Sequence, residues 1–147
     1  MPPPQPLATS RKVKSEVKAS PALSLFSRPG DGTIRSRRIA ILVANGVAGE
    51  AVRKLHADLL GLGAVPRFVG VRLGTVQPDA GEGIEVEVTV EAAPSVLWDA
   101  VIVPDGTDAT ERLEANGQVL EFLKDQYRHC KTLLALGSGG SLLQAAN

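Results

Sequence analysis

The stretch Lys131-Thr-Leu-Leu-Ala-Leu-Gly-Ser-Gly-Gly-Ser-Leu-Leu143 decides the fold that we expect for this chain. Leu133–Leu136 has the length and apolar character of a buried strand, and the small residues after it allow a sharp turn into a helix that begins at Ser141. Such a strand–turn–helix unit presents the residue at its bend to solvent, which is the geometry of a nucleophile elbow. Gly137 occupies the bend and has no side chain. The sequence therefore predicts the scaffold of a hydrolase-like domain without its reactive group.

The rest of the chain alternates strand-like and helix-like segments. Unbroken apolar runs favour parallel strands covered on both faces, and apolar residues at helical spacing favour helices between them. We expect strands at Arg38–Ala44, Ala64–Leu73 and Asp99–Pro104, and helices at Glu50–Leu62, Asn116–His129 and Ser141–Asn147. The first of these strands should be the central one. This order predicts an α/β domain with a mostly parallel sheet and helices on both of its faces.

Three further segments have different patterns. Residues 84–91 alternate between apolar and polar side chains, which predicts a half-exposed strand at a sheet edge or in a small side hairpin. Pro94–Trp98 should form a short helical turn. Asp105–Thr110 should be a loop at the carboxyl end of its strand, and Asp105 and Asp108 are expected to cap that loop.

The N-terminal quarter differs from the rest of the chain in charge. Residues 1–38 contain eight Lys and Arg residues against Glu16 and Asp31, a net charge of +6, together with six of the ten prolines. Because the whole chain is neutral, the remainder is −6. This composition predicts an extended, solvated linker arm over residues 1–36, followed by one domain over residues 37–147. An arm that binds nucleic acid or membrane is the alternative, although a basic run alone is weak evidence for either.

Composition argues against several classes of function. Aromatic residues make up 3% of the chain, too few for the stacking platforms that bind RNA or single-stranded DNA. No stretch approaches the ~20 apolar residues of a membrane-spanning helix, and the proline-rich N-terminus has no secretory apolar region. Cys130 is the one cysteine, so no internal disulfide can form. We therefore expect a cytoplasmic protein that binds neither nucleic acid nor membrane.

The turn Gly137–Ser141 permits two interpretations. Main-chain amides at the start of a helix can bind a phosphate or a carboxylate, so an anion site is one of them. A glycine turn kept for tight packing is the interpretation that we favour. Ser138 and Ser141 are poor candidates for a nucleophile because their positions suggest no histidine or aspartate partner. Asn45–Gly49 lacks the glycine pattern of a dinucleotide-binding loop.

The remaining reactive side chains are also interpreted as structural. Arg128 and Lys131 beside Cys130 would suit a redox-sensing thiol. A buried, inert thiol is favoured, because Cys130 continues an apolar helical stripe formed by Val119, Leu120, Leu123 and Tyr127. His56 and His129 are expected at the surface or at helix ends. No residue is assigned to catalysis, to a cofactor or to a metal.

Four stretches carry a resemblance to a known family. They are Ser20-Pro-Ala-Leu-Ser-Leu-Phe26, Arg38-Ile-Ala-Ile-Leu-Val-Ala-Asn-Gly-Val47, Pro94-Ser-Val-Leu-Trp-Asp-Ala-Val-Ile-Val-Pro-Asp-Gly106 and Tyr127-Arg-His-Cys-Lys131. The strands that lead into Asp105 and Gly137 are similar to those of the class I glutamine-amidotransferase-like superfamily. More closely, the four stretches resemble the C-terminal domain of large-subunit heme catalases, and residues 1–20 resemble the linker that precedes it.

The resemblance implies a flavodoxin-like, doubly wound fold in which the catalytic side chains of the superfamily are missing. In catalytic members of the superfamily the elbow carries a cysteine, often followed by a histidine, and an acidic residue after the first strand supports the thiolate. These positions fall on Gly137, Ser138 and Ala48. The C-terminal domains of large catalases also lack catalytic side chains at these positions. The family's sheet continues past the elbow helix, so the resemblance also implies a fold that is truncated at its C-terminus, as in a fragment.

The resemblance further implies a role and a set of partners. A non-catalytic accessory domain would assist the assembly or stability of a tetrameric heme catalase that disproportionates hydrogen peroxide, with the catalase core as its partner. When freed, it would bind unfolded client proteins as a holdase. The heme would belong to the core, because Tyr127, the one tyrosine, follows Leu123 by four residues where the proximal motif has an arginine. A deglycase or amidotransferase-type enzyme with an unrecognised site is the alternative.

Overall fold

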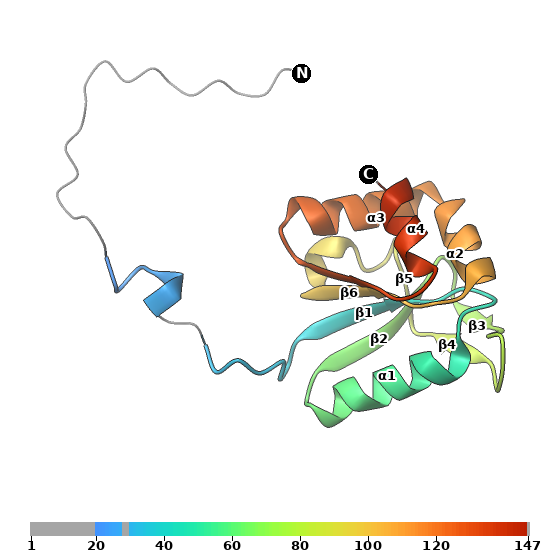
Figure 1. Ribbon diagram of the computed structural model, residues 1–147, viewed down its shortest axis with the longest axis horizontal. Helices are drawn as coiled ribbons and strands as arrows, with labels where there is room; N and C mark the ends of the chain where they lie inside the picture. The colour runs from blue at the N-terminus through green and yellow to red at the C-terminus, as the bar shows by residue number, and fades with distance from the viewer. Residues whose placement is uncertain (1–19, 28–29, 147) are drawn as a thin grey trace, which may run out of the picture. The chain divides into compact units, whose positions relative to one another are not determined.

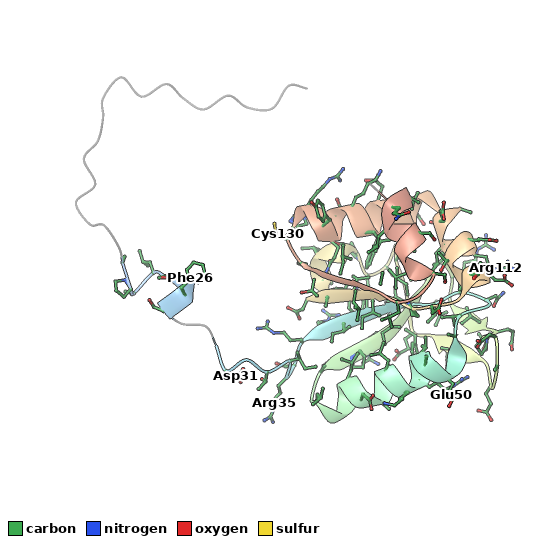
Figure 2. The ribbon with its side chains drawn as sticks, in the orientation of Figure 1. Phe26, Asp31, Arg35, Glu50, Arg112 and Cys130 are labelled. Carbon is green, nitrogen blue, oxygen red and sulfur yellow. The ribbon has the colours of Figure 1, made fainter. Side chains whose placement is uncertain are left out.

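The computed structural model describes residues 20–27 and 30–146, and the rest of the expected linker arm lies outside the described residues. Internal contacts divide the chain into two compact units, residues 1–33 and residues 34–147, so the division falls three residues before the boundary expected at 36/37. The described part of the first unit contains a 3-10 turn, η1 (Leu25–Ser27), in which the side chain of Phe26 is exposed (Figure 2).

The second unit is built on a five-stranded parallel sheet (Figure 1). Its strand order is β5-β2-β1-β6-β7, so β1 is central, as predicted. The strands are β1 (Arg38–Leu42), β2 (Val65–Gly70), β5 (Val88–Thr89), β6 (Ala100–Val103) and β7 (Thr132–Ala135). The helices are α1 (Gly49–Gly61), the 3-10 turn η2 (Ser95–Leu97), α2 (Thr107–Glu114), α3 (Gly117–Arg128) and α4 (Gly139–Ala145).

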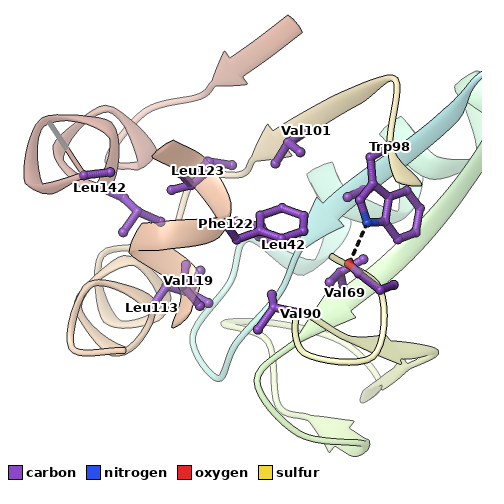
Figure 3. Close-up of a cluster of buried hydrophobic side chains, with 14 residues drawn as sticks. Leu42, Val69, Val90, Trp98, Val101, Leu113, Val119, Phe122, Leu123 and Leu142 are labelled. Atoms are coloured by element: carbon purple, nitrogen blue, oxygen red, sulfur yellow. Dashed lines mark hydrogen bonds between the residues drawn. The ribbon is translucent and has the colours of Figure 1, made fainter. Parts of the chain in front are cut away.

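Helices cover both faces of this sheet, which confirms the predicted α/β layers. Side chains alternate along β1, because successive residues of a strand point to opposite faces. Ile39 and Ile41 pack in a buried cluster with Val52 of α1. Ala40 and Leu42 belong to a second cluster, on the face covered by α2, α3 and α4 (Figure 1). Figure 3 shows this second cluster, to which the three helices contribute Leu113, Val119, Phe122, Leu123 and Leu142.

Helix α2 occupies a segment where a loop was expected over Asp105–Thr110, so that expectation was wrong. It rested on the turn-forming residues and overlooked the apolar spacing that follows them. Ala109 and Leu113 are four residues apart and are 3% and 2% exposed. Burial of this one face stabilises the helix. Gly106, with a φ of 133°, turns the chain from β6 into α2.

The alternating stretch at residues 84–91 forms two short strands instead of one. β4 (Ile84–Val86) pairs antiparallel with β3 (Gly74–Val76) in a two-stranded side sheet, and β5 pairs with β2 at the edge of the main sheet. The stretch therefore contributes one strand to a side hairpin and one strand to the edge of the main sheet, the two locations that the sequence predicted as alternatives. The break falls at Glu87, whose carboxylate accepts a hydrogen bond from the Phe68 amide at 2.8 Å and pairs with Arg67 at 2.5 Å.

Helix α3 buries Val119, Phe122, Leu123 and Gln126. Tyr127 is 76% exposed, and Cys130 lies at the surface (Figure 2), so the prediction that this thiol is buried at the end of an apolar stripe was wrong. The reason is that the helix ends at Arg128. Cys130 then takes a positive φ of 53°, which carries it out of the helical spacing before β7 begins.

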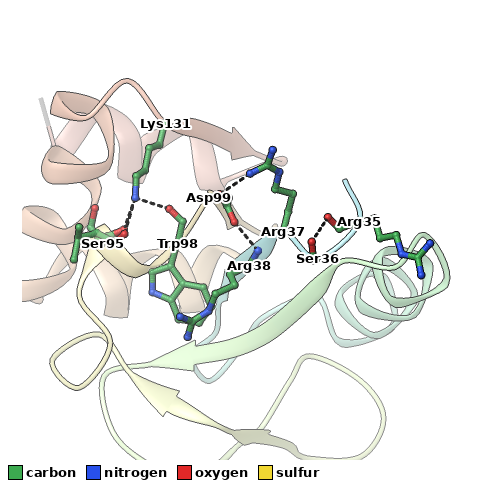
Figure 4. A network of polar contacts seen from close by, with 9 residues as sticks. Arg35, Ser36, Arg37, Arg38, Ser95, Trp98, Asp99 and Lys131 are labelled. Atoms are coloured by element: carbon green, nitrogen blue, oxygen red, sulfur yellow. Dashed lines mark hydrogen bonds and ion pairs between the residues drawn. The ribbon is translucent and has the colours of Figure 1, made fainter. Parts of the chain in front are cut away.

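The amino ends of β1, β6 and β7 are joined by a polar network (Figure 4). The Lys131 ammonium donates to the main-chain carbonyls of Ser95, Val96 and Trp98 at 3.3, 2.8 and 2.7 Å. It thereby supplies a donor to carbonyls at the end of η2, where the Ser95 carbonyl also accepts a hydrogen bond from the Trp98 amide at 3.1 Å. The Asp99 carboxylate accepts a hydrogen bond from the Arg38 amide at 2.8 Å. The network fixes η2 against the start of β7.

Substitution of Lys131 with Met should therefore destabilise the fold. The change keeps the length of the side chain but leaves three carbonyls without their shared donor, which should lower the free energy of unfolding by about 1–3 kcal/mol. Urea denaturation measures this loss. Lys54→Met is the matched control, because Lys54 pairs with Asp58 on the exposed face of α1, and its loss should stay within about 0.5 kcal/mol. Equal losses in the two variants would contradict the role of the network.

Candidate functional site

The candidate site is the edge of the sheet at which β1, β6 and β7 end. Ligands of parallel α/β sheets bind at this carboxyl edge, and the three positions that the family resemblance singled out lie there. Three loops meet at this edge. They are Asn45–Ala48 after β1, Pro104–Gly106 after β6 and Leu136–Ser138 after β7. The Ala48 amide donates to the Asp105 carbonyl at 2.9 Å, and the Gly106 amide lies 3.0 Å from the Ser138 hydroxyl.

Gly137 forms the predicted bend between β7 and α4. Its φ is +50°, a backbone conformation that residues with a Cβ adopt at a cost. The space beside it is also taken, because a Cβ built on Gly137 would overlap the carboxyl group of Asp105. The volume in which a nucleophilic side chain would begin is thus occupied by a side chain from another loop.

The Asp105 carboxylate is held at the elbow by three donors. Its Oδ1 accepts hydrogen bonds from the Ser138 amide, the Ser138 hydroxyl and the Gly106 amide, each at 2.8 Å. These bonds hold the pKa of Asp105 below its ordinary value of 3.8, with the Ser138 amide as the largest cause. The group is therefore an anion at neutral pH. The Ser138 amide, which an external anion would need, already serves this internal carboxylate.

The hydroxyl of Ser138 contacts groups from the loop after β6 and from α2. Its oxygen lies within hydrogen-bond distance of the Asp105 carboxylate, the Gly106 amide and, at 3.3 Å, the Thr110 hydroxyl. A carboxylate whose pKa is lowered is a poor general base, because a base works best when its pKa is near the operating pH. These contacts hold the turn between β7 and α4 against the loop after β6.

Ala48 lies in the loop after β1, at the position where catalytic members of the superfamily carry an acidic residue. Its side chain is only a methyl group. It is the N-terminal cap residue of α1 and makes no side-chain cap. The Asp79 carboxylate, from the loop between β3 and β4, supplies the missing acceptor and takes a hydrogen bond from the Gly49 amide at 2.8 Å. Sequence reasoning missed this contact because the two residues are 30 positions apart and share no local pattern.

The main chain is closely packed around two further glycines at this edge, Gly106 and Gly139. A Cβ on Gly106 would lie 2.5 Å from the Gly46 carbonyl oxygen, and one on Gly139 would lie 2.7 Å from the Val103 carbonyl oxygen. Both distances are far below a normal carbon–oxygen contact. A cavity of about 700 Å³ lies elsewhere, beside α3, β7 and α4, and is lined by Leu123, Lys124, Tyr127, Arg128, Leu133, Leu143, Gln144 and Ala146.

Residues 35–147 match the sequence model of the C-terminal domain found in long catalases. The chain belongs to this family. Among its relatives it is 38% identical over 132 residues to Catalase HPII of Pseudomonas putida and 34% identical over 137 residues to Catalase-B of Dictyostelium discoideum. The alignments cover 89% and 91% of this chain and 19% of each relative. The catalase C-terminal domain thus spans about a fifth of the length of the catalases that it matches.

Solved structures place the fold in a wider group. A THiJ/PfpI family protein from Pseudomonas syringae has a TM-score of 0.66 at 25% identity, over 89% of this chain and 54% of that one. Oxidised DJ-1 from Toxoplasma gondii has a TM-score of 0.70 at 18% identity, over 76% of this chain and 62% of that one. These neighbours share the flavodoxin-like fold of the class I glutamine-amidotransferase-like proteins, as the sequence predicted.

The histidines and the tyrosine of this domain lie on α1 and at the C-terminal end of α3. His56 stacks on Phe68 with ring centroids 4.5 Å apart and belongs to α1, whereas Tyr127 belongs to α3 on the opposite face of the sheet. His129 is the C-terminal cap residue of α3, which ends at Arg128. Over residues 20–27 and 30–146, no three His, Cys, Asp or Glu side chains gather as metal ligands. Within the same ranges, no helix combines the length and the apolar character needed to cross a bilayer.

Gly137→Ala should destabilise the domain by about 2 kcal/mol or more, because it adds a Cβ at positive φ and forces it against Asp105. Asp105→Ala should reduce the additional loss caused by Gly137→Ala, since it removes the clashing carboxyl group. Urea unfolding of the two single variants and the double variant measures the coupling. Losses that simply add would show that the carboxylate does not occupy the elbow. Gly140→Ala is the matched control, because a Cβ there meets open space.

Acid should destabilise the domain partly through Asp105. Because the pKa of Asp105 is lower in the folded chain than in the unfolded chain, the unfolded chain binds the proton first as the pH falls. The stabilisation is present above the unfolded value and is lost as the pH falls through the lower, folded value. Unfolding measured between about pH 6 and pH 2 should show a smaller acid loss for Asp105→Asn than for the unchanged chain. Asp108→Asn, in the same segment, should retain the larger loss, and an equal loss in all three chains would refute the assignment.

Proposed function

We propose that this domain is a non-catalytic accessory domain of a long heme catalase. The observation that carries the proposal is the Asp105 carboxylate, which fills the elbow and uses the Ser138 amide. Catalysis at an elbow needs a nucleophile and unoccupied donors for the developing negative charge. Here the nucleophile position is Gly137, and a donor beside it serves an internal anion. The Asp105 carboxylate thus occupies the space in which a catalytic member of the superfamily would carry its nucleophile.

Membership of the family supports the accessory role that we propose. The catalase core would bind heme and disproportionate hydrogen peroxide, and this domain would add to the assembly or stability of the tetramer from outside the heme pocket. Its own described residues support this division, because its histidines and its tyrosine are not arranged around a common site. Binding of unfolded proteins as a holdase is the finer part of this proposal and would use exposed apolar side chains such as Leu134 and Leu136.

Two measurements test the proposal together. The first incubates the purified chain with aldehyde, glycated-amine and amide substrates, the substrate classes of the alternative enzyme, and separately with hydrogen peroxide. No turnover is expected in any of these assays. Turnover by the unchanged chain that is lost in Ser138→Ala would establish an active elbow and overturn the non-catalytic assignment.

The second measurement tests the accessory role itself. Residues 35–147 replace the matching C-terminal domain in Catalase HPII of Pseudomonas putida, and thermal inactivation is compared with that of the same catalase without the domain. We expect the chimaera to retain its tetramer to a higher temperature than the shortened catalase, with the same peroxide turnover per heme. A chimaera no more stable than the shortened catalase would remove the accessory role, whatever the outcome of the turnover assays.

A further inference from the structure

The amino ends of the strands form the edge of the sheet at which the chain enters the second unit. β1 pairs in parallel with β2 and β6, and β6 pairs in parallel with β7, so these strands all begin at one edge. Residues 34–37, the incoming segment, are fixed there (Figure 4). The Ser36 amide donates to the Gly63 carbonyl at 2.7 Å, and Ile34 packs against the buried cluster that contains Val52 of α1. The chain therefore reaches the domain at a defined place.

Exposed apolar side chains lie on both sides of the incoming segment. Two belong to η2, which precedes β6, and three lie from the end of α1 to the start of β2. Between these two groups Arg37 pairs with Asp99 at 3.4 Å, so the pair adds no net charge. Apolar side chains that gather on an exposed face mark a site at which another protein binds. The amino-edge surface, as we call it, consists of side chains that are 37% to 65% exposed, namely Leu60, Leu62, Val65, Val96 and Leu97.

η2 presents Val96 and Leu97 on a turn that is held from beneath. Lys131 donates to carbonyls of this turn, and the Ser95 hydroxyl donates to the buried side chain of Gln126 at 3.0 Å. These contacts hold the main chain and leave the side chains of Val96 and Leu97 exposed. A turn that is already ordered loses little conformational entropy when it binds a partner. The amino-edge surface is thus suited to docking.

The family identifies a partner that would be attached beside this surface. Residues 35–147 match a domain at the C-terminal end of long catalases, and the alignment spans 19% of the length of Catalase HPII of Pseudomonas putida. The same alignment covers 89% of this chain, more than residues 35–147 alone make up, so it also includes residues before the domain. In such a catalase the core would be joined to the domain through the incoming segment. A tethered partner has a high effective concentration at a surface near its attachment point.

We propose that the amino-edge surface docks on the catalase core that precedes this domain in a long catalase. The inference rests on the proposed function and adds which face of the domain meets the core. Leu62 and Val65 contact the core on one side of the incoming segment, and Val96 and Leu97 contact it on the other. Docking removes the exposed parts of these side chains from water, which stabilises the attached arrangement.

Hydrogen exchange compares the full chain alone with the catalase chimaera that carries residues 35–147. Exchange over residues 60–65 and 94–98 should be at least about tenfold slower in the chimaera, because docking covers these segments. Exchange over residues 71–76, beyond the carboxyl end of β2, should be equal in the two proteins. Slower exchange confined to other segments, or found nowhere, overturns the proposal. Protection of the amino-edge surface that rises with the concentration of the full chain alone identifies a second copy as the occupant and overturns it as well.

Leu62→Asp combined with Val96→Asp tests the surface directly in the chimaera. Docking would bury both carboxylates, so exchange over residues 60–65 and 94–98 should return to the rates of the full chain alone. Because the two side chains are 65% and 64% exposed, the same changes in the full chain should leave its urea midpoint unchanged. Leu73→Asp is the matched control, at a site 69% exposed after β2, and should leave exchange in the chimaera unchanged. Equal effects of the double variant and the control contradict docking at this surface.

These results are distinguishable from those that test the accessory role. A chimaera that is more stable than the shortened catalase, yet shows no protection at the amino-edge surface, refutes this docking and leaves the accessory role intact. Protection at the surface without any gain in thermal stability supports the docking and removes the stabilising role.

Discussion

The contact between the Asp105 carboxylate and the Ser138 amide is the constraint on which the carboxyl edge of this domain depends. It joins the loop after β6 to the bend after β7, and the main chain of Asp105 also accepts a hydrogen bond from the loop after β1 through Ala48. One residue therefore connects three strand ends. The contact requires Gly137, because any side chain at that position would compete with the carboxylate for the same space.

The chain shares its fold with DJ-1 and THiJ/PfpI proteins, and the bend after its β7 is filled by a side chain of the chain itself. A reactive elbow needs an open position, and an open position leaves amides without partners. When the nucleophile is absent, those amides need another acceptor, since unpaired polar groups are costly. Asp105 supplies it from within the chain. In this chain the glycine at the bend and the carboxylate that fills the space beside it belong to one arrangement.

The sequence predicted most of the fold because most of the fold is encoded locally. The apolar run at Arg38–Leu42 has no alternation, which identified a central parallel strand, and the glycines after Leu136 identified the elbow. Prediction failed where local patterns conflict or where the contact is distant. The turn residues before Ala109 hid helix α2, and the stripe that was extended to Cys130 ignored the end of the helix. Glu87 divided an alternating stretch by pairing with Arg67 of another strand.

The sequence by itself determined the layered α/β class, the bend at Gly137 and the absence of a nucleophile there, because each of these depends on residues that are neighbours along the chain. The tertiary structure alone decided what fills the bend and what caps α1. Asp105 and Ser138 are 33 residues apart, and Gly49 and Asp79 are 30 apart. No local pattern records such pairs, since they become neighbours only when parallel strands bring their carboxyl ends together.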